Sequence, residues 1–402
     1  MNLILNEGYE HNKKISITKG ARIKIKNSFF LDLSNCAGAL LLGHNSKVFK
    51  KSLKKIISNK ISNYAAPNIY AENLSKYLKK IFPNFDKFIF CNSGSEAIIK
   101  TLRIVRAISK KKIVGVEGSW HGSVDQFLYQ KKGKDKFPLS AGLSNFYKNN
   151  LIFIPYNNIR ESKKILEKNK KKISSIFIEP IQGCLPINES QEYLTFIYNF
   201  CKLNNILLIF DEIVTGLRTT KGSVHKKYNI KPSIVTLGKC IGGGMPIGVI
   251  GLSKEILIKL KKKKVFFGGT YSGNSISALV GYDLVKHILK RRNIIQSLNR
   301  KAKKIETEIN SFLCKNKIKA RIYRFESILR IIFSDKKILN RPQRDFLEKK
   351  NNKKKVKFLK FLYKEKIYLS TSGLIFISDQ MKKVDINQII FTFKKGFLRY
   401  FN

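Results

Sequence analysis

Residues 206–212 of this chain read ILLIFDE, five apolar residues followed by two acids. An apolar run of this length predicts a strand buried on both faces, and Asp211 is the first polar residue after it. Residues 234–239 repeat this arrangement as IVTLGK, with a lysine at the end. In an open α/β sheet, ligands bind at the carboxyl ends of the strands. Asp211 and Lys239 are therefore the first candidates for functional residues.

The sequence around these two strands alternates between short apolar runs and helical patterns. We expect further strands at residues 87–91, 112–116, 176–178 and 249–251. Helices are expected at residues 69–81, after residues 92–96 as far as residue 108, and at 192–203. Continuous apolar strands separated by helices predict an α/β fold with a parallel sheet covered on both faces.

The two ends of the chain have a different character. Near the start, residues 21–25 and 29–33 alternate around a turn, which predicts a β-hairpin. A long helix is expected from Ser275 into the 290s. It is followed by a strand at 328–333 and helices at 351–366 and 385–397, while residues 336–355 include the segment most typical of a mobile surface loop. We therefore predict three parts: an N-terminal segment at 1–45 that joins a small domain, a large domain at 46–285 and a C-terminal small domain at 286–402.

The formal net charge of +52 is the most unusual property of the composition. The lysines are spread through nearly every segment, with short runs such as 110–112 and 261–264, which is typical of a solvated surface. A nucleic-acid or other polyanionic partner is the alternative. The six cysteines form no CxxC pair and have no metal-ligand spacing. No signal peptide or membrane-length apolar stretch is visible. We expect a reduced, cytoplasmic protein with no metal, no membrane association and no specific nucleic-acid partner.

Three features at predicted strand ends carry chemistry. Residues 92–96, NSGSE, stand between a strand and a helix, where small residues can form an anion cradle. The alternative is that a serine of this segment is only an ordinary N-cap of the helix. A buried Asp211 needs a partner such as a protonated ring nitrogen, unless it only caps a loop. Lys239 stands beside the glycines at 242–244 and can form a Schiff base there, although most lysines are surface residues. Together the three are the parts that a pyridoxal phosphate site needs.

Six sequence blocks occur in an order that resembles the class III pyridoxal-phosphate-dependent aminotransferases, nearest to the glutamate-1-semialdehyde 2,1-aminomutase branch. The blocks are NSGSEA at 92–97, SWHG at 119–122, EPIQG at 179–183, FDEIVTGLR at 210–218, TLGK at 236–239 and GGTYSGN at 268–274. The resemblance implies the fold of fold-type I enzymes. In that fold, a large domain with a mostly parallel, seven-stranded sheet between helices is joined by a smaller α+β domain from both termini.

The resemblance also implies roles for the residues at the cofactor's reactive and charged ends. Lys239 matches the lysine that forms the Schiff base, and Asp211 matches the partner of the pyridine nitrogen. Gly94 and Ser95 match the turn that binds the phosphate.

Four more residues are implied around the ring and the phosphate. Trp120 takes the place of an aromatic residue that stacks on one face of the ring, and Ile213 would pack on the other face. Glu179 belongs to the same pocket. Thr270 matches a threonine that reaches the phosphate from the neighbouring subunit, which implies a homodimer with shared active sites.

The function predicted on this basis is amino transfer between a small amino donor and a keto or aldehyde acceptor, through a Schiff base on Lys239. The alternative is an intramolecular aminomutase, which Val214 favours, because ω-aminotransferases usually carry Gln there. The segment before Lys19 is short and lacks the Pro-Val-Arg-like element through which aminomutases recognise their substrate, which favours an aminotransferase. A basic nucleic-acid-binding protein on a decayed enzyme fold is the rival from another class. The chemically competent cofactor residues count against it.

Overall fold

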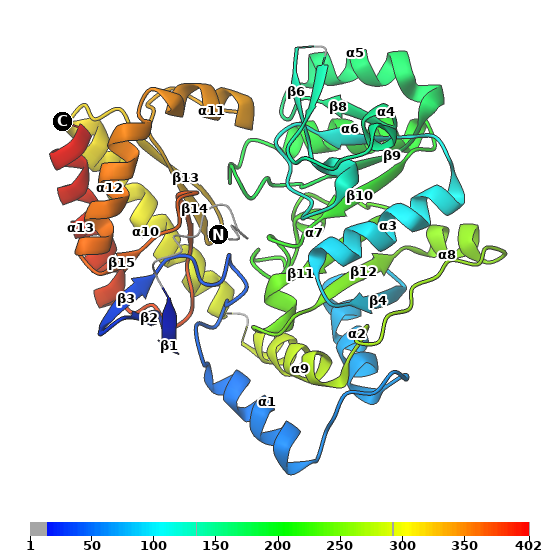
Figure 1. The fold of residues 1–402 in the computed structure, drawn as a ribbon, viewed down its shortest axis with the longest axis horizontal. Helices are drawn as coiled ribbons and strands as arrows, with labels where there is room; N and C mark the ends of the chain where they lie inside the picture. Colours follow the sequence, from blue (N-terminus) through cyan, green and yellow to red (C-terminus); the bar gives the residue numbers. More distant parts are fainter. Residues whose placement is uncertain (1–13, 134, 292, 402) are drawn as a thin grey trace.

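The computed structural model describes residues 14–133, 135–291 and 293–401. Within these ranges the strands form four sheets, of which the largest has seven strands (Figure 1). No helix among the described residues is long and apolar enough to cross a membrane.

The seven-stranded sheet is mostly parallel, as the sequence predicts. Its strands lie in the order β4 (Lys87–Cys91), β12 (Gly248–Leu252), β11 (Ile234–Gly238), β10 (Leu207–Asp211), β9 (Ile173–Ile178), β5 (Lys112–Val116) and β8 (Leu151–Ile154). Strand β12 is antiparallel to both of its neighbours, whereas the pairs from β11 to β8 are all parallel. The predicted fold class, a mostly parallel α/β sheet of the fold-type I kind, is confirmed.

Both faces of this sheet are covered, and the strand residues show it. Leu208 and Phe210 belong to one buried apolar cluster, while Ile209 between them belongs to a second. Successive side chains of a strand point to opposite faces, so each cluster fills one side of the sheet. The longer helices of this half are α1 (Lys47–Ser58), α2 (Ile69–Ile81), α3 (Gly94–Ile108), α5 (Ile159–Asn169), α6 (Gln191–Leu203), α8 (Lys254–Leu260) and α9 (Ser275–Lys290), of which α1 packs on α9.

Short elements complete this half of the molecule. Helix α3 packs on β4, β11 and β12, and α2 packs on α9. The short elements are η1 (Asp125–Phe127), β6 (Tyr129–Lys132), β7 (Asp135–Pro138), α4 (Asn145–Asn149), η2 (Lys170–Lys172), α7 (Val224–Lys227) and η3 (Lys239–Gly242).

The N-terminal and C-terminal segments build a second group of elements together, beside the large sheet in Figure 1. The predicted hairpin forms as β2 (Arg22–Ile25) and β3 (Ser28–Asp32), flanked by β1 (Ile15–Lys19) and by β15 (Ile367–Tyr368) from the other end of the chain. The remaining elements are the sheet β13 (Arg321–Phe325), β14 (Ile328–Ile332) and β16 (Leu374–Phe376), with helices α10 (Asn293–Lys315), α11 (Arg341–Lys349), α12 (Asn352–Lys364) and α13 (Lys383–Phe401). The domain boundaries at residues 45 and 285 stay predictions.

One expectation for this region is wrong. The segment expected as a loop at 336–355 contains helix α11, which begins after Asn340, whose side chain accepts a hydrogen bond from the Gln343 amide at 3.1 Å. Its sequence looks like a loop because its two buried side chains, Arg344 and Glu348, are charged. The helix from Ser275 ends at Lys290, and a second helix begins at Asn293.

Candidate active site

The structure brings seven of the eight predicted site residues together around one cavity of about 160 Å³. These residues, from five different segments of the chain, are Gly94, Ser95, Trp120, Glu179, Asp211, Ile213 and Lys239. The eighth, Thr270, lies in another cavity of about 560 Å³, which Asn68, Phe90 and the glycines around Thr270 also line.

Asp211 is the last residue of β10, and its carboxylate is fixed by two contacts. Oδ1 accepts a hydrogen bond from the Ile213 amide at 3.1 Å, and Oδ2 lies 2.8 Å from Nδ1 of His121. Asp211 and His121 are both buried, and the other ring nitrogen of His121 has no partner among the described residues. The carboxylate is thereby oriented toward the cavity that it lines.

Lys239 follows β11 directly and begins the short helix η3. Its φ is +44°, in the left-handed region, which costs a non-glycine residue about 1–3 kcal/mol. Burial lowers the pKa of its amine, although Glu179 and Asp211 act in the opposite direction. A lowered pKa increases the fraction of neutral amine, which is the nucleophilic form.

The N-terminus of α3 lines the cavity through Gly94 and Ser95. Gly94 is its first residue, and a Cβ there would lie 2.7 Å from Cδ1 of Ile213. The Ser95 hydroxyl accepts a hydrogen bond from the Ser123 amide at 3.1 Å. Gly122 has φ +74°, and a Cβ on it would lie 2.2 Å from the Ser95 Oγ. The first backbone N–H groups of a helix have no partner within the helix, so an anion is stabilised at this N-terminus. A side chain at Gly94 or Gly122 would fill the space beside it.

Glu179 and Trp120 line both this cavity and a larger adjoining cavity of about 450 Å³, which is not the cavity at Thr270. Glu179 follows β9, and its carboxyl accepts hydrogen bonds from the Trp120 amide at 2.7 Å and the Gly183 amide at 3.1 Å. It is only 3% exposed, and burial, with Asp211 nearby, raises its pKa to about 7. The Trp120 side chain remains 54% exposed and lines both cavities.

The chemistry of this residue set fits pyridoxal phosphate. The cavity offers an amine for the aldehyde, a carboxylate for the ring nitrogen and a helix N-terminus for the phosphate, which are the polar parts of that molecule. The Ile213 side chain lies close to Gly94 and lines the cavity, so it offers an apolar surface on which the cofactor ring can pack. These three groups match the polar parts of the cofactor without any further polar residue.

Sequence reasoning missed two sets of residues near the site. The role of His121 depends on a contact with Asp211, ninety positions away in the chain. Its only signal is that it follows Trp120 directly. A second cavity of about 450 Å³ adjoins the first, shares Lys239 and Glu179 with it, and is lined by Arg330, Arg341 and Arg344. An arginine inside the apolar strand at 328–333 was the available signal for this second set.

Comparison with known proteins identifies the family. The model of the family Aminotransferase class-III matches residues 7–351. A glutamate-1-semialdehyde 2,1-aminomutase from Caldicellulosiruptor saccharolyticus is 31% identical over 380 residues, which cover 93% of this chain and 88% of the relative. The enzyme of the same name from Archaeoglobus fulgidus is 33% identical over 323 residues, covering 78% of this chain and 76% of the relative.

Solved structures with low sequence identity share the fold. An omega-transaminase from Sphaerobacter thermophilus superposes with a TM-score of 0.87 at 19% identity, covering 96% of this chain and 91% of the other. A glutamate-1-semialdehyde-aminomutase from Pseudomonas aeruginosa gives 0.85 at 16% identity, covering 97% and 88%. A transaminase with bound pyridoxal phosphate gives 0.85 at 19% identity, covering 97% and 91%. With the family match and the relatives above 30% identity, the chain belongs to the class III pyridoxal-phosphate-dependent aminotransferases and is related to their glutamate-1-semialdehyde 2,1-aminomutase branch.

Proposed function

We propose that this enzyme moves an amino group between a small amino donor and a keto or aldehyde acceptor, with pyridoxal phosphate in the cavity at Lys239. The observation that carries the proposal is the meeting of the Lys239 amine, the Asp211 carboxylate and the N-terminus of α3 around about 160 Å³. When bound, the cofactor supplies an aldehyde that condenses with amines and a ring that withdraws electrons from the adjacent carbon.

Lys239 and Asp211 have the catalytic roles in this proposal. Lys239 would hold the cofactor through Nζ until a donor amine displaces it. Its Nζ would then move a proton from the substrate carbon to the former aldehyde carbon of the cofactor, and would move a proton in the reverse direction during the second half-reaction, which its lowered pKa favours. Asp211 would face the ring nitrogen and keep a proton on it, with its carboxylate oriented by His121.

The remaining residues would position the cofactor. Gly94 and Ser95 would bind the phosphate, and Trp120 and Ile213 would lie against the two faces of the ring. Glu179 would border the substrate side of the cavity, since it lines both cavities.

We further propose a homodimer in which Thr270 serves the partner's site. In support, Thr270 lies apart from Lys239 in its own chain, and Phe266 and Tyr271 beside it are 74% and 60% exposed. Exposed aromatic side chains of this kind mark interaction surfaces. Mixing inactive Lys239→Ala subunits with Thr270→Ala subunits is expected to restore one complete site in each mixed dimer. An unchanged activity after mixing would contradict this shared site.

An intramolecular aminomutase is the second candidate, and the same residues would serve it. Its support is the identity of 31% and 33% with two glutamate-1-semialdehyde 2,1-aminomutases, together with the apolar Val214 in the cavity. An aminotransferase needs two substrates for turnover, whereas an aminomutase turns over a single amino-aldehyde. For either activity we propose a reducing, cytoplasmic location, which the six free cysteines support.

The test is a spectral titration of the purified holoenzyme with a panel of amino donors. We expect the visible absorbance of the lysine-bound cofactor to disappear with a competent donor. Borohydride reduction followed by peptide mapping should find the cofactor on Lys239. Lys239→Ala should lose the absorbance and the labelled peptide, while the exposed-lysine control Lys231→Ala should keep both. Labelling of another lysine in the wild type would refute the assignment.

A further inference from the structure

The larger cavity extends from the cofactor site to a wall of arginines. Its volume is about 450 Å³, and Trp120, Glu179 and Lys239 form the side that it shares with the smaller cavity. Strand β14 and helix α11 contribute Arg330, Arg341 and Arg344 to its lining. A substrate that reacts beside Lys239 and fills this cavity would meet these guanidinium groups.

Arg330 lies in the middle of an otherwise apolar strand and is only 4% exposed. Its Nε has no hydrogen-bond partner among the described residues, and its ion pair with Glu348 spans 3.6 Å. Burial and the neighbouring Arg344 lower its pKa to about 10. A buried cation with so few partners is costly unless a further anion is bound.

Arg218 shows what a buried structural arginine looks like in the same chain. Its guanidinium donates hydrogen bonds to the carbonyls of Gly38 and Ile377 and to the hydroxyl of Ser327. It does not line the substrate cavity. The Nε atoms of both arginines lack a hydrogen-bond partner among the described residues, so the difference lies in the rest of the guanidinium. Arg330 has the 3.6 Å ion pair with Glu348 in place of the carbonyl partners of Arg218, and it lines the cavity, so a purely structural role explains it poorly.

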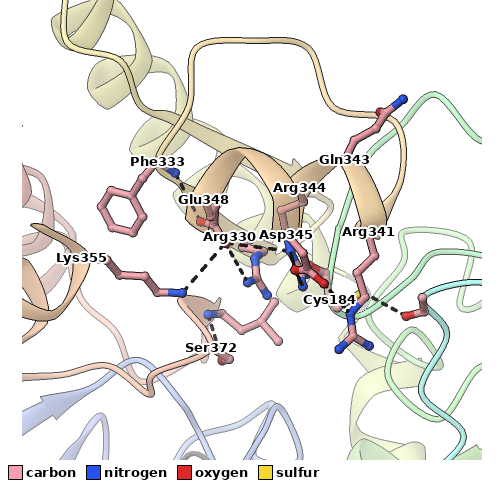
Figure 2. A network of polar contacts seen from close by, with 12 residues as sticks. Cys184, Arg330, Phe333, Arg341, Gln343, Arg344, Asp345, Glu348, Lys355 and Ser372 are labelled. Carbon is pink, nitrogen blue, oxygen red and sulfur yellow. Dashed lines mark hydrogen bonds and ion pairs between the residues drawn. The ribbon is translucent and has the colours of Figure 1, made fainter. Parts of the chain in front are cut away.

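Arg330 belongs to a network of cations and carboxylates that Figure 2 shows. The Glu348 carboxylate is shared by Arg330 at 3.6 Å, Arg344 at 3.9 Å and Lys355 at 3.9 Å. Asp345 pairs with Arg344 and lies 3.3 Å from Arg341. Four cations thus meet two carboxylates in this network, so the cations outnumber the acids with which they pair.

We propose that Arg330, supported by Arg344 and Arg341, binds an anionic group of the substrate, a carboxylate or a phosphate, at the end remote from the reacting amino group. This inference rests on the proposed function, because it assigns the substrate class of the same site. Guanidinium groups bind both anions through paired, charge-assisted hydrogen bonds. Glu179, which lines both this cavity and the smaller one at Lys239, would repel an anionic group bound in the reverse orientation whenever it is ionised.

The test uses donor pairs that differ mainly in the remote charge. L-glutamate is compared with L-glutamine, and O-phospho-L-serine with L-serine, in single-turnover half-reactions followed by the cofactor absorbance. We expect the wild type to prefer the charged member of at least one pair, and that pair identifies the anion. Arg330→Gln should lower kcat/KM for the charged donor by about 10- to 100-fold, the range for hydrogen bonds to charged groups. The neutral donor should change little.

Two further variants separate recognition from folding. Arg321→Gln removes an exposed arginine from the adjacent strand β13. It should leave unchanged the ratio of kcat/KM for the charged donor to kcat/KM for the neutral donor. Arg330→Lys retains the charge and should recover part of the preference. Each variant is first compared with the wild type by circular dichroism and thermal unfolding.

Anion binding without chemistry supplies the second readout. Glutarate or inorganic phosphate should raise the Tm of the wild-type holoenzyme, and the increase should be smaller in Arg330→Gln. If neutral donors react while the wild type shows neither a charge preference nor a Tm increase, this inference is wrong and the proposed function stands. A ratio that is the same in Arg330→Gln and wild type also overturns it. If no donor reacts and Lys239 carries no cofactor, the proposed function itself fails.

Discussion

Replacing Glu179 by Gln is expected to remove a pH-dependent loss of stability from the cofactor-free protein. Glu179 is nearly completely buried, and its pKa is raised from 4.5 to about 7, mainly by burial and then by Asp211. In the unfolded chain the same carboxyl is exposed to water and titrates near its usual value. At a pH between 4.5 and about 7, Glu179 of the folded protein therefore retains a proton that the same residue of the unfolded chain has lost.

The sign of the effect follows from proton linkage. Where the folded state binds more protons, the free energy of unfolding falls as the pH rises. The stability that Glu179 contributes is thus fully present below pH 4.5 and is lost as the pH rises through about 7. Each unit of pKa difference corresponds to about 1.4 kcal/mol, so the whole loss amounts to about 3 kcal/mol. Gln has no such titration.

The measurement is urea unfolding of the apoprotein at several pH values between about 5 and about 8. We expect the stability of the wild type relative to Glu179→Gln to fall by about 2–3 kcal/mol across this range. A constant offset of about 1–3 kcal/mol is also expected, because the Gln amide would face the Trp120 or the Gly183 N–H. Glu192→Gln, on the exposed face of α6, is the control and should show no comparable slope. If the stability difference between the wild type and Glu179→Gln did not change with pH, the reasoning would be refuted. The hydrogen bonds from the two amides, which lower the pKa of Glu179, would then outweigh the burial that raises it.

Three other substitutions test the remaining geometry. Gly122→Ala should weaken binding of pyridoxal phosphate by at least about tenfold in a cofactor titration, because its Cβ would meet the Ser95 Oγ at 2.2 Å and its φ is +74°. Arg218→Met should lower the free energy of unfolding by about 2–4 kcal/mol in urea, since buried carbonyl partners lose their donor. Asp211→Asn should slow the half-reaction with amino donors by about 10²- to 10⁴-fold in stopped-flow measurements, and His121→Ala, which removes only the group that orients Asp211, should slow it less.

The sequence predicts most of the fold because its strands are continuous apolar runs. Residues 87–91 and 112–116 form strands with the predicted bounds, and the helix at 69–81 also has the predicted bounds. Helix α11 was not predictable in the same way. Its buried positions hold Arg344 and Glu348, which read as surface residues until their partners are known.

The candidate site shows the same division. Asp211 and Lys239 end neighbouring apolar strands, so their placement at one edge of the sheet follows from local pattern and sheet topology. The contact of Asp211 with His121 joins two distant segments and depends on tertiary packing. The separation of Thr270 from Lys239 within one chain agrees with the expectation from the family resemblance, but no local pattern of residues predicts it.

The high positive charge of the chain does not explain its buried arginines. Surface charge in this protein is carried mainly by lysines spread along the chain, and an exposed lysine costs little free energy. Arg330 is different, because its neighbours along β14 are all Ile or Leu and an apolar residue at that position would pack without desolvating a charge. The strand therefore retains a residue that its own stability does not require. Since the same side chain lines the cavity that begins at Lys239, recognition of an anionic substrate supplies the missing reason.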